Sequence, residues 1–123
     1  MNTEIIGGAS LRFSPDERLA AAAGGVVRYF ADAAEMPGEA VAQLQAATLT
    51  ACVAAFSKIP SHDAQLLVEV SRFADRIEVA ITRVGVAPEK ITTPGFDRLE
   101  QESHNGATTF RLTKMLQQPR SCR

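Results

Sequence analysis

The chain has 123 residues, of which 46% are apolar, and its formal net charge is −1. This length suits a single domain with a hydrophobic core, and the near-neutral charge argues against a surface built for nucleic acid or anionic membranes. No apolar run approaches the roughly 18 residues that cross a bilayer. Residues 1–4 do not resemble the start of a signal peptide, and two isolated cysteines form no disulfide framework. We therefore expect a cytoplasmic protein.

The first part of the chain predicts a strand followed by an amphipathic helix. Residues 9–13 read as a short strand. Ser14 can cap a helix, Pro15 suits its first turn and Glu17 completes a capping box, so we expect a helix that runs to about Ala34. Its apolar stripe recurs every three or four residues and consists of Leu19, Ala23, Val26, Val27 and Phe30.

Two glycines interrupt this helix, and a second helix follows. We interpret Gly24 and Gly25 as sites of close packing against a neighbour in preference to a hinge. The second helix is expected over residues 37–59, since a residue before Pro60 is pushed out of the helical region. Small residues on both of its faces indicate burial on more than one side. Its stripe consists of Val41, Leu44, Thr48, Leu49, Cys52, Ala55, Phe56 and Ile59.

The second half of the chain predicts two hairpins. Alternating apolar residues over 65–70 and 76–81 indicate an antiparallel pair, and the glycine- and proline-rich range 83–95 reads as a loop. A second hairpin, 96–103 with 108–115, turns at Asn105-Gly106. We expect one α+β domain over residues 1–116: a two-layer sandwich in which two helices cover one face of a mostly antiparallel sheet of about five strands. Residues 117–123 read as a flexible tail.

Several segments carry a family resemblance. The helical stretch from Ala46 to Lys58 resembles the nucleotide-binding helix of the histidine-kinase-like ATPases (the GHKL superfamily), with most similarity to the anti-sigma-factor serine kinases. The stretch 11–15 is similar to the first strand and helix entry of that family, and 106–112 to its last strand. The order of elements is also similar over residues 11–116. The resemblance implies a truncated histidine-kinase-like ATPase fold.

The nucleotide ligands of that family are replaced in this chain. Its helix carries a glutamate and a magnesium-binding asparagine where Thr50 and Ala54 stand, and its Asp-x-Gly-x-Gly motif falls where Arg83 replaces the aspartate and Gly85 alone matches. With Lys58, these residues would line a degenerate cleft. The interval 84–95 is too short for the lid and further helix of the family. The resemblance therefore implies a pseudo-enzyme with no catalytic residue, cofactor or metal.

Other polar groups predict no separate site. His62 and His104 fall in expected turns without a second ligand at metal-binding spacing. Cys52 lies on an apolar stripe and is expected in the core. A cluster near the cleft could meet an anion, although a solvated surface is the favoured interpretation; it consists of Arg72, Arg76, Arg83 and Lys58.

The expected function is binding of another protein. We expect an anti-sigma-factor-like regulatory module in bacterial signalling and transcription regulation that binds a partner protein or forms a homodimer, without nucleic-acid or membrane partners. Tyr29 and Phe30 are the expected contact residues, since neighbours on a helix cannot both face one core. Two alternatives stay open: a protein that binds a nucleotide or small anion weakly without hydrolysis, and a structural dimerisation module.

Overall fold

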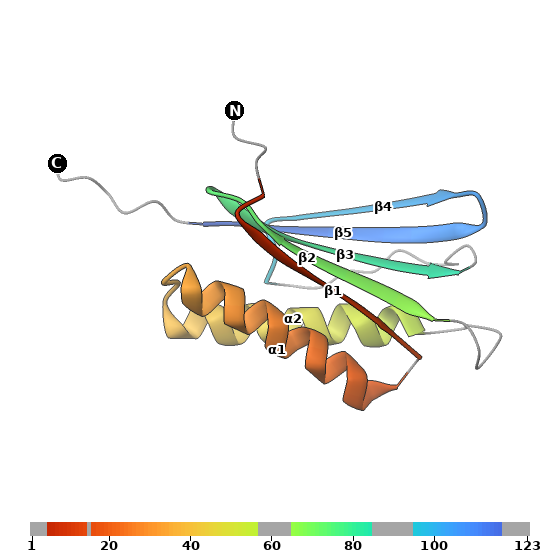
Figure 1. Ribbon diagram of the computed structural model, residues 1–123, viewed down its shortest axis with the longest axis horizontal. Coiled ribbons are helices and arrows are strands. Elements are labelled where there is room, and N and C mark those ends of the chain that lie inside the picture. Colours follow the sequence, from red (N-terminus) through yellow and green to blue (C-terminus); the bar gives the residue numbers. More distant parts are fainter. Residues whose placement is uncertain (1–4, 15, 57–64, 85–94, 117–123) are drawn as a thin grey trace, which may run out of the picture.

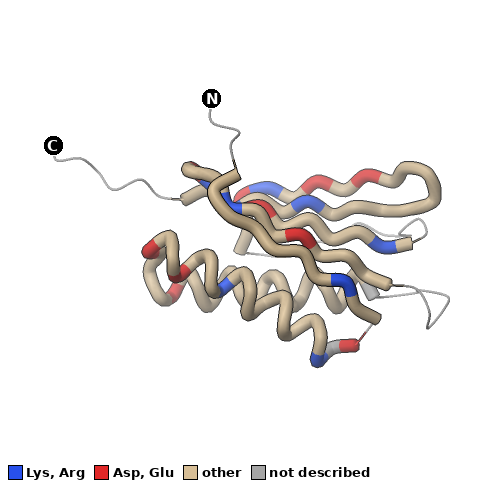
Figure 2. The backbone as a smooth tube through the Cα atoms, in the orientation of Figure 1, with Lys and Arg blue, Asp and Glu red and all other residues tan. Residues whose placement is uncertain are grey.

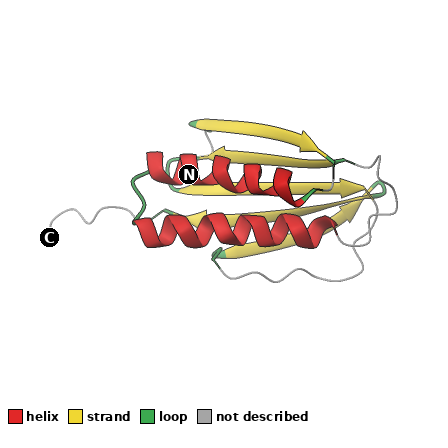
Figure 3. Cartoon of the chain, turned by 90° about the horizontal axis from the view of Figure 1, so that it is seen from below, coloured by secondary structure: helices red, strands yellow, loops and turns green. Residues whose placement is uncertain are grey.

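Two helices cover one face of a five-stranded sheet, as Figure 1 and Figure 3 show. The computed structural model describes residues 5–14, 16–56, 65–84 and 95–116. The sheet order is β1-β2-β3-β5-β4, and every neighbouring pair is antiparallel. The predicted α+β two-layer sandwich is therefore confirmed. The elements are β1 (Gly7–Phe13), α1 (Glu17–Ala33), α2 (Gly38–Phe56), β2 (Leu66–Arg72), β3 (Arg76–Val84), β4 (Arg98–His104) and β5 (Ala107–Met115).

The core lies between the sheet and the two helices. Side chains alternate between the two faces of each strand, so the apolar residues of β2, β3 and β5 share the face under the helices. The helices meet this face mostly with alanine and other small residues, which lets their backbones lie close to the sheet. The largest fully buried side chains of the sheet are Phe110, Leu66, Ile77, Ile81 and Leu112. Each contributes about 1.5–3 kcal/mol through removal of apolar surface from water.

Helix α1 begins two residues later than its sequence predicts. Its N-cap is Asp16, whose side chain accepts a hydrogen bond from the Arg18 backbone N–H at 2.8 Å. The prediction that Ser14 caps this helix is therefore wrong. Aspartate and serine cap helices about equally well, so the sequence offers two candidates and geometry selects the later one. The helix ends at Ala33, close to the expected end.

The buried stripes of both helices are narrower than predicted. In α1, Ala23 and Val27 are fully buried, but Leu19 is 40% exposed. In α2, Leu49 is 36% exposed, whereas Leu44 and Cys52 are fully buried. Each helix packs on the sheet along one side, and apolar residues at the margin of that side are exposed to solvent. The expected end of α2 at Ile59 lies outside the described residues.

The hairpin predictions agree with the structure except at the end of β3. Asn105 and Gly106 have φ values of 53° and 78°, the left-handed pair that a tight two-residue turn between β4 and β5 requires. Arg83 and Val84, expected at the start of a loop, instead continue β3 opposite residues of β5. The remainder of the expected loop, 85–94, lies outside the described residues.

The two glycines of α1 have different neighbours. A Cβ on Gly24 would lie 3.3 Å from both Cγ and the carbonyl oxygen of Gln45, so this glycine lets α1 approach α2. A Cβ on Gly25 would meet nothing within 4 Å, so close packing does not explain that residue. The prediction of close packing is confirmed for Gly24 and wrong for Gly25.

This difference predicts opposite effects for the same substitution. Gly25→Ala should raise the free energy of unfolding by about 0.5–1 kcal/mol, because alanine loses less conformational entropy in a helix. Gly24→Ala should raise the free energy of unfolding by less than Gly25→Ala, or lower it, because Gln45 must shift to make room for the added Cβ. Urea denaturation followed by circular dichroism measures both values. Equal stabilisation by the two substitutions would contradict the close approach of α1 and α2 at Gly24.

Candidate functional site

The expected nucleotide cleft is closed at the position of Arg83. This side chain points to the helix side of β3 and is 3% exposed. Its Nη1 donates to the carbonyl oxygen of Ala55 at 3.2 Å, and its Nε donates to the carbonyl oxygen of Val84 at 3.0 Å. A cation at the C-terminal end of a helix complements the helix dipole and satisfies a carbonyl that has no helical donor. Arg83 therefore joins the end of α2 to β3, and its expected place on a solvated surface is wrong.

Of the other expected cleft residues, the structure describes two, and both belong to α2. Thr50 is exposed on α2, and Ala54 is half-buried near the end of that helix. Lys58 and Gly85 lie outside the described residues. The wider arginine cluster is also absent from the part of the chain that the structure describes. Arg72 and Arg76 flank the β2–β3 turn, at the opposite end of β3 from Arg83.

Arg76 is held by its own neighbours at that turn. Its guanidinium lies over the Phe73 ring at 3.9 Å from the centroid. Nε donates to Glu78 and Nη1 donates to Asp75, each at 2.8 Å. Hydrogen bonds to these two carboxylates raise the pKa of Arg76, the Glu78 bond contributing most. These contacts give Arg76 a role in fixing the turn.

A buried threonine accompanies Arg83 on the inner face of the sheet and pairs with an exposed serine of β4. Thr108 of β5 pairs with Arg83 in register and is fully buried. The hydroxyls of Thr108 and Ser103 lie 3.0 Å apart, which joins β4 to the same end of the sheet. The sequence shows no pattern that marks these two residues, because their role depends on strand register. The Thr108 and Ser103 hydroxyls therefore pair with each other near the end of α2.

Cys52 is a buried residue of α2, as expected. It is fully buried, and burial raises the pKa of its thiol from 9.0 to about 12. Such a thiol is neutral near pH 7 and a poor nucleophile. Within the described residues there is no group of three histidine, cysteine or acidic side chains that could hold a metal ion.

This burial predicts a loss of stability at alkaline pH. A thiol whose pKa is raised by folding contributes stability that is complete below pH 9 and is lost as the pH rises toward 12. Between pH 8 and pH 10, the free energy of unfolding should fall by about 1 kcal/mol more in the wild type than in Cys52→Ala. Urea titrations at both pH values measure this difference. Equal losses in the two proteins would show that the thiol ionises without unfolding.

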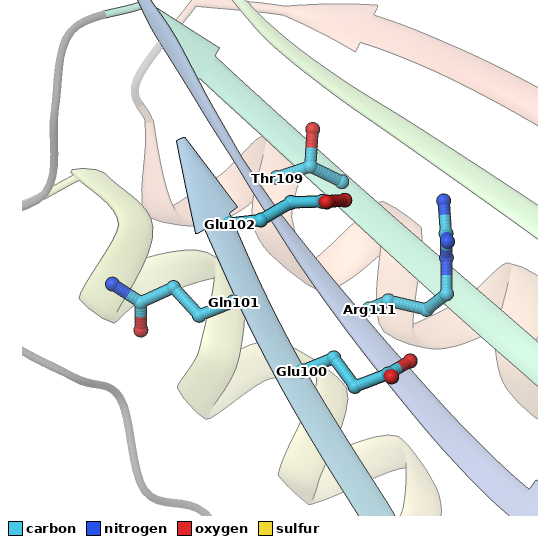
Figure 4. Close-up of a pocket in the computed structure, with 5 residues that line it drawn as sticks. All are labelled: Glu100, Gln101, Glu102, Thr109 and Arg111. Atoms are coloured by element: carbon cyan, nitrogen blue, oxygen red, sulfur yellow. The ribbon is translucent and has the colours of Figure 1, made fainter. Parts of the chain in front are cut away.

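The outer face of the β4–β5 hairpin bears a shallow polar depression of about 410 Å³ (Figure 4). Glu100 and Glu102 alternate along β4, and Thr109 and Arg111 do so along β5. Figure 4 shows that Gln101 points away from these four side chains. Both glutamates are exposed, as predicted for a solvent face. This mixture of charges on an open sheet face resembles ordinary solvated surface.

One solvent-facing side of α2 is apolar. After Glu39, α2 carries no charged residue, and Figure 2 shows most charged residues on the strands and at the helix ends. Leu49 and Val53 are 36% and 37% exposed, and with Ala42 and Ala46 they form a stripe along the outer side of α2. We call these four residues the α2 outer stripe. A shallow groove of about 250 Å³ runs beside it, lined by Ala21, Gly24, Ala42, Gln45, Ala46 and Leu49.

The two aromatic residues expected to contact a partner lie on α1. Tyr29 is 68% exposed, whereas Phe30 is half-buried against the core. Their ring centroids are 5.4 Å apart in an edge-to-face arrangement. The prediction that they face different directions is confirmed. Phe30 also lies beside Gly7, where an added Cβ would come within 3.3 Å of its ring.

Comparisons with known proteins identify no family for this chain. The chain matches no protein-family model, and a search among curated proteins finds no relative. The resemblance to anti-sigma-factor kinases therefore stays a prediction. No helix in the described part of the chain is both long and apolar enough to cross a membrane.

Proposed function

We propose that this protein is a non-catalytic, anti-sigma-factor-like regulatory module that binds another protein through the α2 outer stripe and the adjoining groove. The observation that carries the proposal is the exposed apolar side of α2. A helix that is apolar all round is normally buried on all sides, yet Leu49 and Val53 remain exposed. An uncovered apolar face of this kind is typical of a protein interaction surface.

The shape of this surface favours a helix as the ligand. Residues of the α2 outer stripe recur at spacings of four, three and four along the chain. Facing helices interlock at this periodicity, as knobs from one enter holes on the other. The small side chains of Ala21 and Gly24 deepen the groove next to the stripe. The expected ligand is therefore an amphipathic helix of a regulatory partner, docked apolar side down.

The environment of Arg83 supports the absence of nucleotide chemistry in this proposal. The guanidinium that stands at the position of the family's adenine-binding aspartate donates to two backbone carbonyls inside the protein. Phosphoryl transfer needs bound metal and positioned phosphate groups, and Thr50 and Ala54 supply neither a carboxylate nor an amide. The proposal therefore includes no ATPase or kinase activity.

A matched pair of substitutions tests the binding surface. Ala46→Glu places a charge on the α2 outer stripe, and Ala74→Glu makes the same change at an exposed position in the β2–β3 turn. A protein captured from source cells by the wild type is purified and titrated against each variant by calorimetry. Ala46→Glu should weaken binding by about tenfold or more, equivalent to about 1.4 kcal/mol. Ala74→Glu should bind like the wild type.

Nucleotide addition tests the alternative function. A ligand that binds the folded state raises the midpoint of thermal unfolding by mass action. We expect no shift with ATP or ADP in the presence of Mg²⁺. A concentration-dependent shift, together with equal partner binding by Ala46→Glu and Ala74→Glu, would overturn the proposed function in favour of a nucleotide-binding protein.

A further inference from the structure

The groove beside the α2 outer stripe has different chemistry at its two ends. The residues that line it, from Ala21 to Leu49, are all uncharged. One turn along α1 from Gly24, Arg28 reaches Gln45 of α2, where its Nη1 donates to Oε1 at 3.4 Å. Beyond this contact both helices and their connection expose acidic residues, and Figure 2 shows acidic residues at that end of the helical layer. The groove therefore leads from an apolar end to an acidic end.

Three exposed carboxylates form this acidic end: Asp32, Glu35 and Glu39. Glu39 lies three residues before Ala42, so it extends the α2 outer stripe by one position. The ion pair between Asp32 and Arg28 is 3.7 Å long and exposed, and such pairs are weak. Within the described residues no ion pair joins Glu35 or Glu39 to a cation. One arginine and three acids give this end a net charge of −2.

Glu35 has a backbone conformation that favours glycine. Its φ is 61°, in the left-handed region, at the residue that follows the C-cap of α1. The N–H groups of Glu35 and Met36 close the helix end by donating to the carbonyl oxygens of Asp32 and Ala31, at 2.9 and 3.2 Å. Glycine is the usual residue at this position, because a Cβ is strained there. The glutamate therefore places its charge at this corner at a cost in stability, a combination that is common at functional positions.

We propose that the partner segment is a cationic amphipathic helix, with apolar residues on the α2 outer stripe and lysine or arginine side chains over the acidic end of the groove. This partner chemistry rests on the proposed function and deepens it, because it adds the charge and the orientation of the docked helix. The stripe together with Glu39 covers residues 39–53, about 21 Å along α2. About 15 residues of the partner helix would therefore lie on it.

The charges at the two ends of the groove determine where the cations of the partner lie. At the start of α1, Asp16 and Arg18 pair with each other at 3.0 Å, so these two residues add no net charge. Basic side chains would gain little there, whereas over Glu35 and Glu39 they would meet unpaired carboxylates. An acidic turn at the same place would be repelled. The partner helix therefore docks with its basic end over the α1–α2 connection.

Two labelled synthetic peptides test this charge preference. Both have the same amphipathic sequence of about 15 residues with leucines at helical spacing, and the last turn carries lysines in one peptide and glutamates in the other. Fluorescence anisotropy with the full chain should give a dissociation constant at least about fivefold lower for the lysine peptide. This difference should shrink as the ionic strength rises from about 0.05 to about 0.5 M, because salt screens exposed charges.

Substitutions at the acidic end provide matched variants. Glu39→Lys reverses one charge there, and Glu100→Lys makes the same change on the outer face of β4. Glu39→Lys should lose the preference for the lysine peptide, and Glu100→Lys should keep it, with circular dichroism confirming that both are folded. Glu35→Gly removes a charge and relieves the left-handed strain. It should bind the lysine peptide about two- to fivefold more weakly than the wild type, yet unfold at a higher urea concentration.

The outcomes separate this partner chemistry from the proposed function. Equal affinity for the two peptides, or tighter binding of the glutamate peptide, would overturn the cationic helix and leave the α2 outer stripe as the partner surface. The same conclusion follows if neither peptide binds while Ala46→Glu still weakens binding of the partner purified from source cells. Peptide and partner binding that are equally strong in Ala46→Glu and Ala74→Glu would instead overturn the proposed function.

Discussion

Arg83→Ala should lower the free energy of unfolding by about 2–4 kcal/mol, although the substitution removes a charged residue. The guanidinium is 3% exposed and donates to the Ala55 and Val84 carbonyls. Alanine would leave the Ala55 carbonyl without this donor at the end of α2, and it would empty the space that the long side chain fills. Arg83→Lys should lower the free energy of unfolding by less than Arg83→Ala, because lysine keeps the charge near the helix C-terminus. It should still be less stable than the wild type, because lysine lacks the forked guanidinium.

The control also replaces an arginine with alanine, but on the neighbouring strand β5. Arg111 is exposed on the outer face of β5, so Arg111→Ala should change the free energy of unfolding by less than about 0.5 kcal/mol. Urea denaturation followed by far-ultraviolet circular dichroism suits a protein without tryptophan. Similar losses in the two variants would show that Arg83 is not a structural link. A stable Arg83→Ala protein would restore the idea that Arg83 faces an open cleft.

The role of Arg83 shows where sequence reasoning about the site fails. An arginine next to a glycine- and proline-rich stretch predicts a solvated loop, and the family resemblance predicts a cleft position. Arg83 is buried because the end of α2 lies opposite β3, and these two segments are far apart in the sequence. Thr108 and Ser103 were not anticipated for the same reason, since strand register brings them together. Local patterns do not contain such information.

The strands and their turn were predicted more accurately than the helix surfaces. Alternation over β2 and β3 identifies the buried face directly, and Asn105-Gly106 specifies a turn by its local backbone preference. In the helices, apolar residues occupy more than one side, so the pattern alone cannot distinguish core from interface. The pattern therefore predicts that Leu19 and Leu49 are buried, but both are exposed. Leu49 belongs to the α2 outer stripe, the surface proposed to bind a partner protein.

Gly95→Ala should lower the free energy of unfolding by about 2–4 kcal/mol, because two penalties coincide at this residue. Its φ of 104° lies where residues with a side chain are strained. An added Cβ would also lie 2.9 Å from the Ala47 Cβ and 3.2 Å from the Gln43 carbonyl oxygen. Gly95 thus lets the chain entering β4 pass directly over α2. The substitution would push this segment away from the helix, and with it Phe96, which packs against the core.

Gly106→Ala separates backbone strain from steric contact. Gly106 also has a positive φ, of 78°, but an added Cβ would meet nothing within 4 Å. We therefore expect Gly106→Ala to cost about 1 kcal/mol, from strain alone. Combining Gly95→Ala with Ala47→Gly removes the nearest atom, so the double variant should recover part of the loss despite the cost of about 1 kcal/mol for glycine in a helix. Urea denaturation of the wild type, Gly95→Ala, Ala47→Gly and the double variant closes a double-mutant cycle. Simple additivity of the two substitutions would contradict a contact between the β4 entry and α2.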